Sequence, residues 1–541
     1  MNQMDRLPHL KFFTLIWISL SGTLALAEPP SLTRLFPCGG CIGTTVQITA
    51  SGKFATWPVQ VDCQPATLQW KALEENGKFE VAIPPDAATQ VYWIRFYTAE
   101  GSSVSKRFIV DDVPTQQELE PNNNIKMGNV IDALPKQIFG VLQKGGDVDV
   151  YRVQLSAGAN LVATIDAQNW LRSPLDAVLQ VTDEKGNVVE ENIDTHNLDP
   201  QIVYTAKHPG VYCVRVMGFP ESPDSTISFV GNDNCQYRLT LTTGGHLEAV
   251  YPLAVQIQQP ATLQPLGIHL PSNLSAWTPT ANSLGEMHFN HPLTTGHCSV
   301  AVVGHPVICE PVSDVNNASI PPLAICGSIQ DPQQKDTWLI QLEKDKSYRF
   351  ETESHAIGFS LDPLVRLLNS EDKEVQKVDE SNGNRDPNFV WKANATGVYK
   401  LVIEDAEGFG GPLHFYRIYV KPVEPSVKIQ GTVDHVEGEI GKPIEVKFTV
   451  ERLDGFSDVL EAELIADPNR PLPAECTLSS SVSEKEGDSS KELKWILQTP
   501  VAISQAIRIQ IRSKTDPARL FSVTFGDEKA PNLWLTATPS K

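Results

Sequence analysis

The sequence predicts an all-β protein made of tandem β-sandwich modules, for three reasons. Proline makes up 40 of the 541 residues, above the usual share of about 5%, and proline interrupts helices and collects in turns and at strand edges. Short segments alternate in polarity, such as Asp149–Leu155, in which Tyr151, Val153 and Leu155 share one face. The chain also repeats itself, and its length suits three or four domains, or more small ones.

The repeat covers two stretches of the chain, residues 113–245 and residues 309–423. About seven or eight short strands separated by turns in each copy predict a β-sandwich of jelly-roll type. The matched segments are SPLDAVLQVTDEKGNVVEENID (173–194) with SLDPLVRLLNSEDKEVQKVDES (360–381), Asp149–Leu155 with Asp336–Leu342, and Glu120-Pro121 with Glu310-Pro311.

The first copy carries five motifs in order: E-P-N-N-N at Glu120–Asn124, D-x-D-x-Y at Asp147–Tyr151, S-P-L-D at Ser173–Asp176, D-P at Asp199-Pro200 and G-x-Y at Gly210–Tyr212. This pattern resembles the bacterial pre-peptidase C-terminal (PPC) domain over the whole copy, and the second copy resembles it more weakly. The resemblance implies β-sandwiches that accompany secreted peptidases and other exported enzymes. Close relatives of such domains serve as collagen-binding modules of bacterial collagenases.

Three further β modules are predicted around the two copies. Residues 28–112 contain Gly39-Gly40 and a strand–turn–strand pattern that is similar to the opening of IPT/TIG-type immunoglobulin-like domains. Residues 246–308 resemble a shorter module of the same sort. Residues 424–541 alternate in polarity as the strands of a final immunoglobulin-like sandwich do.

Residues 1–27 are typical of a secretory signal peptide. Arg6 and Lys11 precede the apolar stretch Phe12–Leu26, which ends in the small-x-small site Ala25–Ala27. No comparable apolar run follows, so we expect no retained transmembrane helix, and an uncleaved anchor is the alternative. The expected location is the periplasm, the cell surface or the medium.

Nine cysteines in an exported chain indicate disulfides with one thiol left over. Their clustering favours local pairs, although connectivity does not follow from sequence. Cys38-Gly-Gly-Cys41 lacks a partner CxxC and a following histidine, so it indicates a turn rather than a zinc or haem site. The expected pairs are Cys213 with Cys235, Cys298 with Cys309, and Cys63 with Cys38 or Cys41.

An acidic cluster in the first copy predicts a Ca²⁺ site. Asp147 and Asp149 lie two residues apart on an expected strand, so both carboxylates face one way. Ca²⁺ takes six to eight hard oxygens, and the PPC resemblance implies that the matching residues hold it; solvated acids and a capped turn are the alternative. In the second copy we expect no site, because Gln334 replaces Asp147, Ile308 replaces Glu118, and only Glu310, Asp314, Asn316 and Asp336 remain. The six predicted ligands are Glu118, Glu120, Asn122, Asn123, Asp147 and Asp149.

Catalytic motifs are missing from the sequence: it holds no HExxH, GxSxG or P-loop. Asp199 and Asp386 recur between the copies without a recurring histidine, which indicates turn residues rather than a triad. A zinc or copper site is the alternative reading of the segment that holds His288, His291, His297, His305, Cys298 and Cys309.

The sequence therefore predicts a non-catalytic, exported binding, adhesion or scaffold protein of the bacterial envelope. Its ligand would be a protein or a polysaccharide, and the net charge of −21 disfavours nucleic acid. The alternative is a secreted peptidase-associated protein or the accessory subunit of an exported enzyme.

Overall fold

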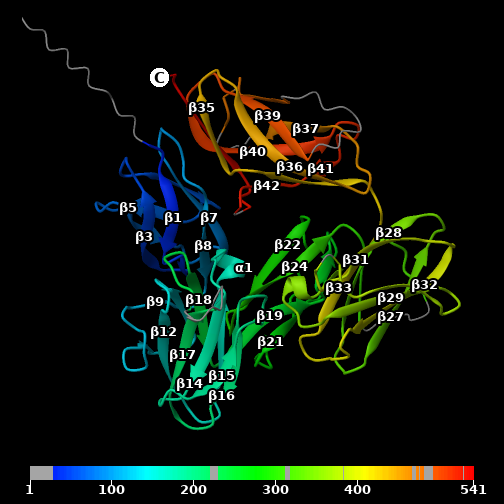
Figure 1. Cartoon of the computed structure of the whole chain (residues 1–541), viewed down its shortest axis with the longest axis horizontal. Helices are drawn as coiled ribbons and strands as arrows, with labels where there is room; N and C mark the ends of the chain where they lie inside the picture. Colours follow the sequence, from blue (N-terminus) through cyan, green and yellow to red (C-terminus); the bar gives the residue numbers. More distant parts are fainter. Residues whose placement is uncertain are drawn as a thin grey trace, which may run out of the picture.

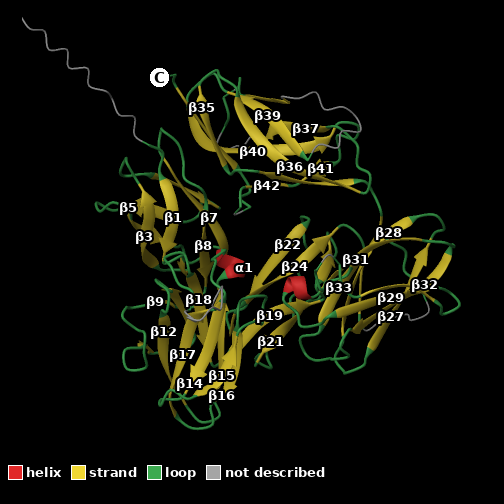
Figure 2. Cartoon of the chain, viewed as in Figure 1, coloured by secondary structure: helices red, strands yellow, loops and turns green. Residues whose placement is uncertain are grey.

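The computed structural model confirms the all-β class. It describes residues 28–219, 229–310, 317–381, 383–465, 471–473, 475–480, 491–527 and 529–540, so the predicted signal peptide and the second-copy residues Asp314 and Asn316 lie outside the described residues. Two short helical turns, α1 (Gln168–Leu171) and a 3₁₀ turn (His355–Ile357), interrupt the strands of the described ranges (Figure 2). None of the described helices is long and apolar enough to cross a membrane.

The first module packs two four-stranded sheets around aromatic side chains, among which Phe79, Phe96 and Phe108 are fully buried. Figure 1 shows it in blue beside the last module, which packs two larger sheets around Phe448 and Trp495. In order across each sheet, the strands of the first module are β1 (Ser31–Phe36), β3 (Thr45–Lys53), β6 (Lys78–Ala82) and β5 (Gln69–Ala72), then β2 (Gly39–Cys41), β8 (Lys106–Asp111), β7 (Gln90–Tyr97) and β4 (Gln60–Gln64); those of the last module are β38 (Thr477–Ser480), β39 (Glu492–Gln498), β36 (Ile444–Leu453), β34 (Ser426–Gly431) and β42 (Val523–Phe525), then β35 (His435–Glu439), β43 (Leu533–Thr538), β40 (Ile503–Ser513) and β37 (Leu460–Ile465), with β41 (Leu520–Phe521) beside β40.

Two sandwiches in the middle of the chain have the same strand order, except that β10 of the first has no counterpart among the described strands of the second, and we call them the first and second repeat sandwiches. In each sandwich, every sheet has a long strand in its interior that pairs with a neighbour on either side. The hydrophobic core lies between the two sheets. The strands of the first are β10 (Asn129–Ile131), β12 (Val148–Leu155), β17 (Gly210–Gly218), β14 (Ala177–Thr182) and β15 (Val188–Asn192), facing β16 (Gln201–Thr205), β13 (Asn160–Asp166), β18 (Gln236–Thr242), β11 (Lys136–Val141) and β9 (Thr115–Gln117); those of the second are β27 (Lys335–Leu342), β32 (Gly397–Asp405), β29 (Pro363–Leu368) and β30 (Glu374–Val378), facing β31 (Asn388–Lys392), β28 (Ser347–Glu353), β33 (Phe415–Pro422), β26 (Leu323–Ser328) and β25 (Val307–Cys309).

A smaller middle module separates the repeat sandwiches. It consists of two three-stranded sheets with a core that includes Leu247, Val300 and Cys298. Its strands are β21 (Gln264–Ile268), β19 (Gly245–Tyr251) and β23 (Thr294–Thr295), facing β20 (Ala254–Gln256), β24 (His297–Val303) and β22 (Gly285–Asn290).

The strand registers correct the sequence alignment of the two repeats. Gly140 pairs with Tyr237 across β11 and β18, and Gly327 pairs with Tyr416 across β26 and β33. A Cβ at either glycine would collide with the tyrosine opposite. This register makes Glu310, rather than Ile308, the equivalent of Glu118, because each glutamate accepts a hydrogen bond from the amide that follows the glycine.

The predicted disulfides are wrong: all nine cysteines are free thiols in the structure. Cys235 lies in the core of the first repeat sandwich, whereas Cys213 alternates with the core residues of β17 and so faces the other side. Cys63 lies on β4 and Cys41 on β2, at opposite edges of one sheet. With strands about 4.8 Å apart, that separation exceeds the Cα distance of about 7 Å that a disulfide allows.

Buried ion pairs join the modules. Arg238 of the first repeat sandwich places Nη1 at 3.0 Å from Asp111 of the first module and Nη2 at 2.7 Å from Asp166 of its own sandwich. The two carboxylates also raise the pKa of Arg238, against the effect of burial, which lowers it. The guanidinium is therefore charged and paired although it is buried.

Replacing Arg238 by alanine would leave the buried Asp111 carboxylate without the guanidinium that pairs with it. We expect Arg238→Ala to lower the free energy of unfolding by about 3–5 kcal/mol, as is typical when one partner of a buried pair is removed. Lys428→Ala, which removes an exposed pair with Glu451, should cost less than about 1 kcal/mol. Urea unfolding of the full chain measures both, and equal losses would contradict this role for Arg238.

Candidate metal centre

The predicted ligands converge where the segment after β9 meets the start of β12. Oxygen atoms of Glu120, Asp147 and Asp149 all lie within 4.8 Å of one another. Asp147 and Asp149 are almost fully buried, at 1% and 0% exposure, while Glu120 is exposed. The two-residue spacing of Asp147 and Asp149 predicted that their carboxylates face the same way, and in the structure these carboxylates lie together.

Backbone amides hold the outer oxygens of the cluster in place. Val141 donates its N–H to Glu118 Oε1 at 2.9 Å, and Gln143 donates to Asp147 Oδ2 at 2.7 Å. The Asn123 side-chain amide donates to the other Asp147 oxygen at 2.6 Å. These donors orient the carboxylates without neutralising them.

The inner oxygens of the cluster lack partners. Glu118 Oε2 and Asp149 Oδ1 are buried and receive no hydrogen bond from an amide or a hydroxyl, and both polar side-chain atoms of Asn122 are unpaired in a residue that is 0% exposed. A buried carboxylate or amide left unpaired costs about 1–3 kcal/mol or more. A hard cation would satisfy the unpaired oxygens together.

The pKa values of Glu118 and Asp149 show that the charged forms of these carboxyl groups are disfavoured in the cluster. Burial and the charge of Asp149 raise the pKa of Glu118 to about 10. Burial also raises the pKa of Asp149 to about 7, even though hydrogen bonds from Tyr237 and Glu118 lower it. Without a cation, Glu118 therefore holds its proton at neutral pH.

Two tyrosines complete the site and were not predicted. Tyr237 donates its hydroxyl to Asp149 Oδ2 at 2.5 Å, and the Tyr151 hydroxyl lies 2.5 Å from that of Tyr237. The repeat itself offered a signal for Tyr237, because Tyr416-Arg417 stands at the matching place in the second copy. The separation of 88 residues between Asp149 and Tyr237 hides the contact from local pattern reading.

The second repeat sandwich contains the same framework without the orphaned oxygens. Tyr416 donates to Asp336 at 2.7 Å, as Tyr237 does to Asp149. Gln334, at the position of Asp147, donates its amide to Asp336 Oδ1 at 2.9 Å and to the Ser328 carbonyl at 2.9 Å. A neutral amide here fills the place that a cation would take, so this copy does not fit a metal.

Other candidate residues have structural roles. Asp199 accepts the backbone amides of Ala167, Gln168 and Asn169, and Asp386 accepts those of His355 and Ala356, as predicted for turn residues. Within the described ranges, His288, His291, His297 and His305 belong to no group of three ligands close enough to share a metal. His297 instead lies 3.6 Å from Asp111 and packs edge-on against Trp170.

A family model matches part of the first repeat sandwich. The model described as "Bacterial pre-peptidase C-terminal domain" matches residues 147–218. That range begins at Asp147 and covers β12 to β17, so the match falls within the first repeat sandwich. No curated protein matches the chain.

Solved structures match at low similarity. The pre-peptidase C-terminal domain of a collagenase from Bacillus anthracis is 17% identical, with 23% of this chain and 100% of that chain covered and a TM-score of 0.17. The Bacteroides ovatus protein SGBP-B of a mixed-linkage glucan utilization locus, in complex with a heptasaccharide, is 9% identical, with 73% and 75% covered and a TM-score of 0.16. These scores carry no inference about fold or ligand.

The raised pKa values predict how the metal-free protein responds to pH. Because Glu118 and Asp149 bind protons more tightly when folded, their contribution to stability is complete below about pH 4 and is lost as pH rises through 7 toward 10. In chelator, Glu118→Gln should therefore stabilise the protein at pH 8 relative to the wild type, and much less at pH 5. Calorimetry at both values checks this, with the exposed Glu343→Gln as control; identical pH slopes for wild type and Glu118→Gln would refute it.

Proposed function

We propose that this chain is an exported, non-catalytic binding protein of the bacterial envelope in which Ca²⁺ orders the first repeat sandwich. The observation that carries the proposal is the set of buried, unpaired oxygens on Glu118, Asn122 and Asp149 beside Glu120 and Asp147. Apart from the proton that Glu118 can share with Asp149, these oxygens have no donor within the described part of the chain. Their chemistry suits Ca²⁺, which prefers several carboxylates with one or two amide oxygens.

Calcium in this position would act on module geometry. The ligands come from both the segment that leaves the first module and the first long strand of the sandwich, so one ion would fix the direction in which the chain enters. The nearby side chain of Gln137 already donates to Asp111 of the first module at 2.6 Å. The proposed ligands are Glu118, Glu120, Asn122, Asn123, Asp147 and Asp149.

The lack of HExxH, GxSxG and P-loop motifs in the sequence supports a binding role. The recurring Asp199 and Asp386 hold turns, and the PPC family model describes a domain attached to peptidases rather than a peptidase. We propose that the second repeat sandwich is a further PPC copy without a metal site, and that the flanking modules are immunoglobulin-like. The ligand would be a protein or a polysaccharide; the alternative is an accessory role beside a secreted peptidase.

Calcium should stabilise the wild type and not the Asp149→Asn variant. At a hundredfold excess over Kd, binding adds about 2.7 kcal/mol to the free energy of unfolding, which raises the melting temperature by several degrees. Asp336→Asn is the matched control, because Gln334 neutralises that site. Glu120→Gln, at an exposed ligand, covers the case in which Asp149→Asn fails to fold. An unchanged melting temperature of the wild type in Ca²⁺ and in chelator would remove the calcium proposal.

The enzymatic alternative has its own test. We expect the full chain to produce no cleavage of casein or gelatin with or without EDTA, because the sequence holds no HExxH or GxSxG motif and the described residues contain no histidine metal cluster. Gel analysis after prolonged incubation measures this. Reproducible turnover that disappears in His288→Ala would replace the binding role by a peptidase.

A further inference from the structure

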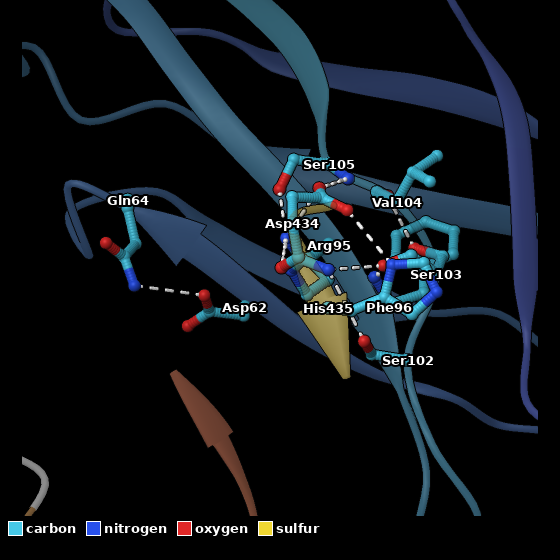
Figure 3. Close-up of polar contacts among 10 residues, drawn as sticks. All are labelled: Asp62, Gln64, Arg95, Phe96, Ser102, Ser103, Val104, Ser105, Asp434 and His435. Atoms are coloured by element: carbon cyan, nitrogen blue, oxygen red, sulfur yellow. Dashed lines mark hydrogen bonds and ion pairs between the residues drawn. The ribbon is translucent and has the colours of Figure 1, made fainter. Parts of the chain in front are cut away.

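The first and last modules of the chain lie side by side, as Figure 1 shows. A buried ion pair joins them: Arg95 of β7 places Nη2 at 2.7 Å from Asp434 Oδ2, and the Ser105 amide donates to the same oxygen at 2.8 Å (Figure 3). Nearby, the rings of Tyr97 and Trp534 pack with centroids 4.6 Å apart. These contacts fix the two modules against each other.

A groove of about 780 Å³ runs along this junction. The first module contributes Gln64, Gln90 and Trp93 to its walls, and the last module contributes Gln510 and Phe521. A small hollow that shares Gln64 and Trp93 with the groove continues inward to Arg95. The buried ion pair is therefore close to the floor of the groove, and neither module alone would form it.

The lining has an unusual composition for this chain. Acidic residues number 65 among 541 and the net charge is −21, yet the groove lining includes no aspartate or glutamate and a single cation, Arg508. Arg508 is exposed and forms no ion pair within the described ranges. One cation is too few for a nucleic acid backbone, so the lining suits an uncharged or weakly acidic ligand.

The polar groups of the lining are carboxamides that can both donate and accept. Gln64 accepts a hydrogen bond from Asn532 across the junction, whereas the Gln90 carboxamide has no partner within the described part of the chain. Carboxamides bind pairs of neighbouring hydroxyls, which also donate and accept. Trp93 is half-buried, and the guanidinium of Arg107 lies 5.0 Å from its ring centre. An aromatic face beside carboxamides matches a sugar ring, which has apolar C–H faces and a polar edge.

We propose that the groove between the first and last modules binds a polysaccharide strand composed mainly of neutral sugars. Trp93 and Phe521 would pack against sugar faces, and Gln90, Gln510 and Arg508 would bind hydroxyls. This inference rests on the proposed function as a binding protein and names its ligand class and site. A bound strand would contact both modules at once, so the contact of Arg95 with Asp434 would act as a positioning interaction.

Affinity electrophoresis of the full chain tests the proposal. The probes are soluble laminarin, glucomannan and xyloglucan as neutral glycans, and alginate as an acidic one. We expect retardation by at least one neutral glycan, a loss of affinity of about tenfold or more in Trp93→Ala, and a smaller loss in Gln90→Ala. Trp391→Ala, at a half-buried tryptophan of the second repeat sandwich, is the matched control and should bind as the wild type does. Because the Gln90 side chain holds nothing in the fold, Gln90→Ala remains informative if Trp93→Ala is destabilised.

The outcomes separate this inference from the proposed function. If neither Trp93→Ala nor Gln90→Ala weakens glycan binding, the groove assignment is wrong while a binding role stands. Retardation by alginate alone would overturn the neutral ligand class. If no glycan retards the wild type, the ligand class is wrong. The calcium part of the proposed function is tested separately, by the melting temperature in Ca²⁺ and in chelator.

Discussion

The rest of the chain depends on one constraint: Tyr237 and Arg238 are consecutive residues of β18, so their side chains face opposite sides of the sheet. On β18, Tyr237 points into its sandwich and meets Asp149, while Arg238 points outward and meets Asp111 of the first module. Successive residues of a strand face opposite sides, so the register that sets the acidic site also sets the module junction. The second repeat uses Tyr416 and Arg417 in the same way, with Arg417 donating to the Leu253 carbonyl of the middle module at 2.9 Å.

Buried charge gives these junctions specificity more than stability. Removing two charges from water costs several kcal/mol, and the Coulomb attraction returns about as much. What the pair gains is orientation, because only one placement of Asp434 gives Arg95 its carboxylate and gives Ser105 its acceptor. A chain of small sandwiches with such contacts at its junctions can bring its first and last modules together (Figure 1). Flexible linkers without such buried contacts would not fix the position of the first module relative to the last.

Strand alternation and the internal repeat allowed the fold class and the meeting of Asp147 with Asp149 to be predicted from the sequence. Pairings set by tertiary structure were not predictable. The Glu-Pro dipeptide suggested that Glu120 matches Glu310, yet the approach of Gly140 to Tyr237 fixes a register in which Glu118 does. Likewise, the separation of only 22 positions between Cys213 and Cys235 suggested a disulfide. In the structure Cys235 faces into the core, whereas Cys213 lies between core residues of β17 and faces away from it, so the two thiols are on different faces.

The two repeats show how one residue decides whether a buried acidic framework needs an external cation. In the second repeat, the Gln334 amide supplies a donor to Asp336, so two carboxylates, one backbone amide and one tyrosine form a closed network. In the first, Asp147 occupies that place and adds a charge instead of a donor, and burial together with this charge raises the pKa of Asp149 to about 7. Proton uptake can relieve part of this repulsion, but it leaves Asn122 without partners. A divalent ion would relieve the repulsion and could also bind the Asn122 oxygen, which is why the proposed metal site belongs with the first repeat and not with the framework that the two repeats share.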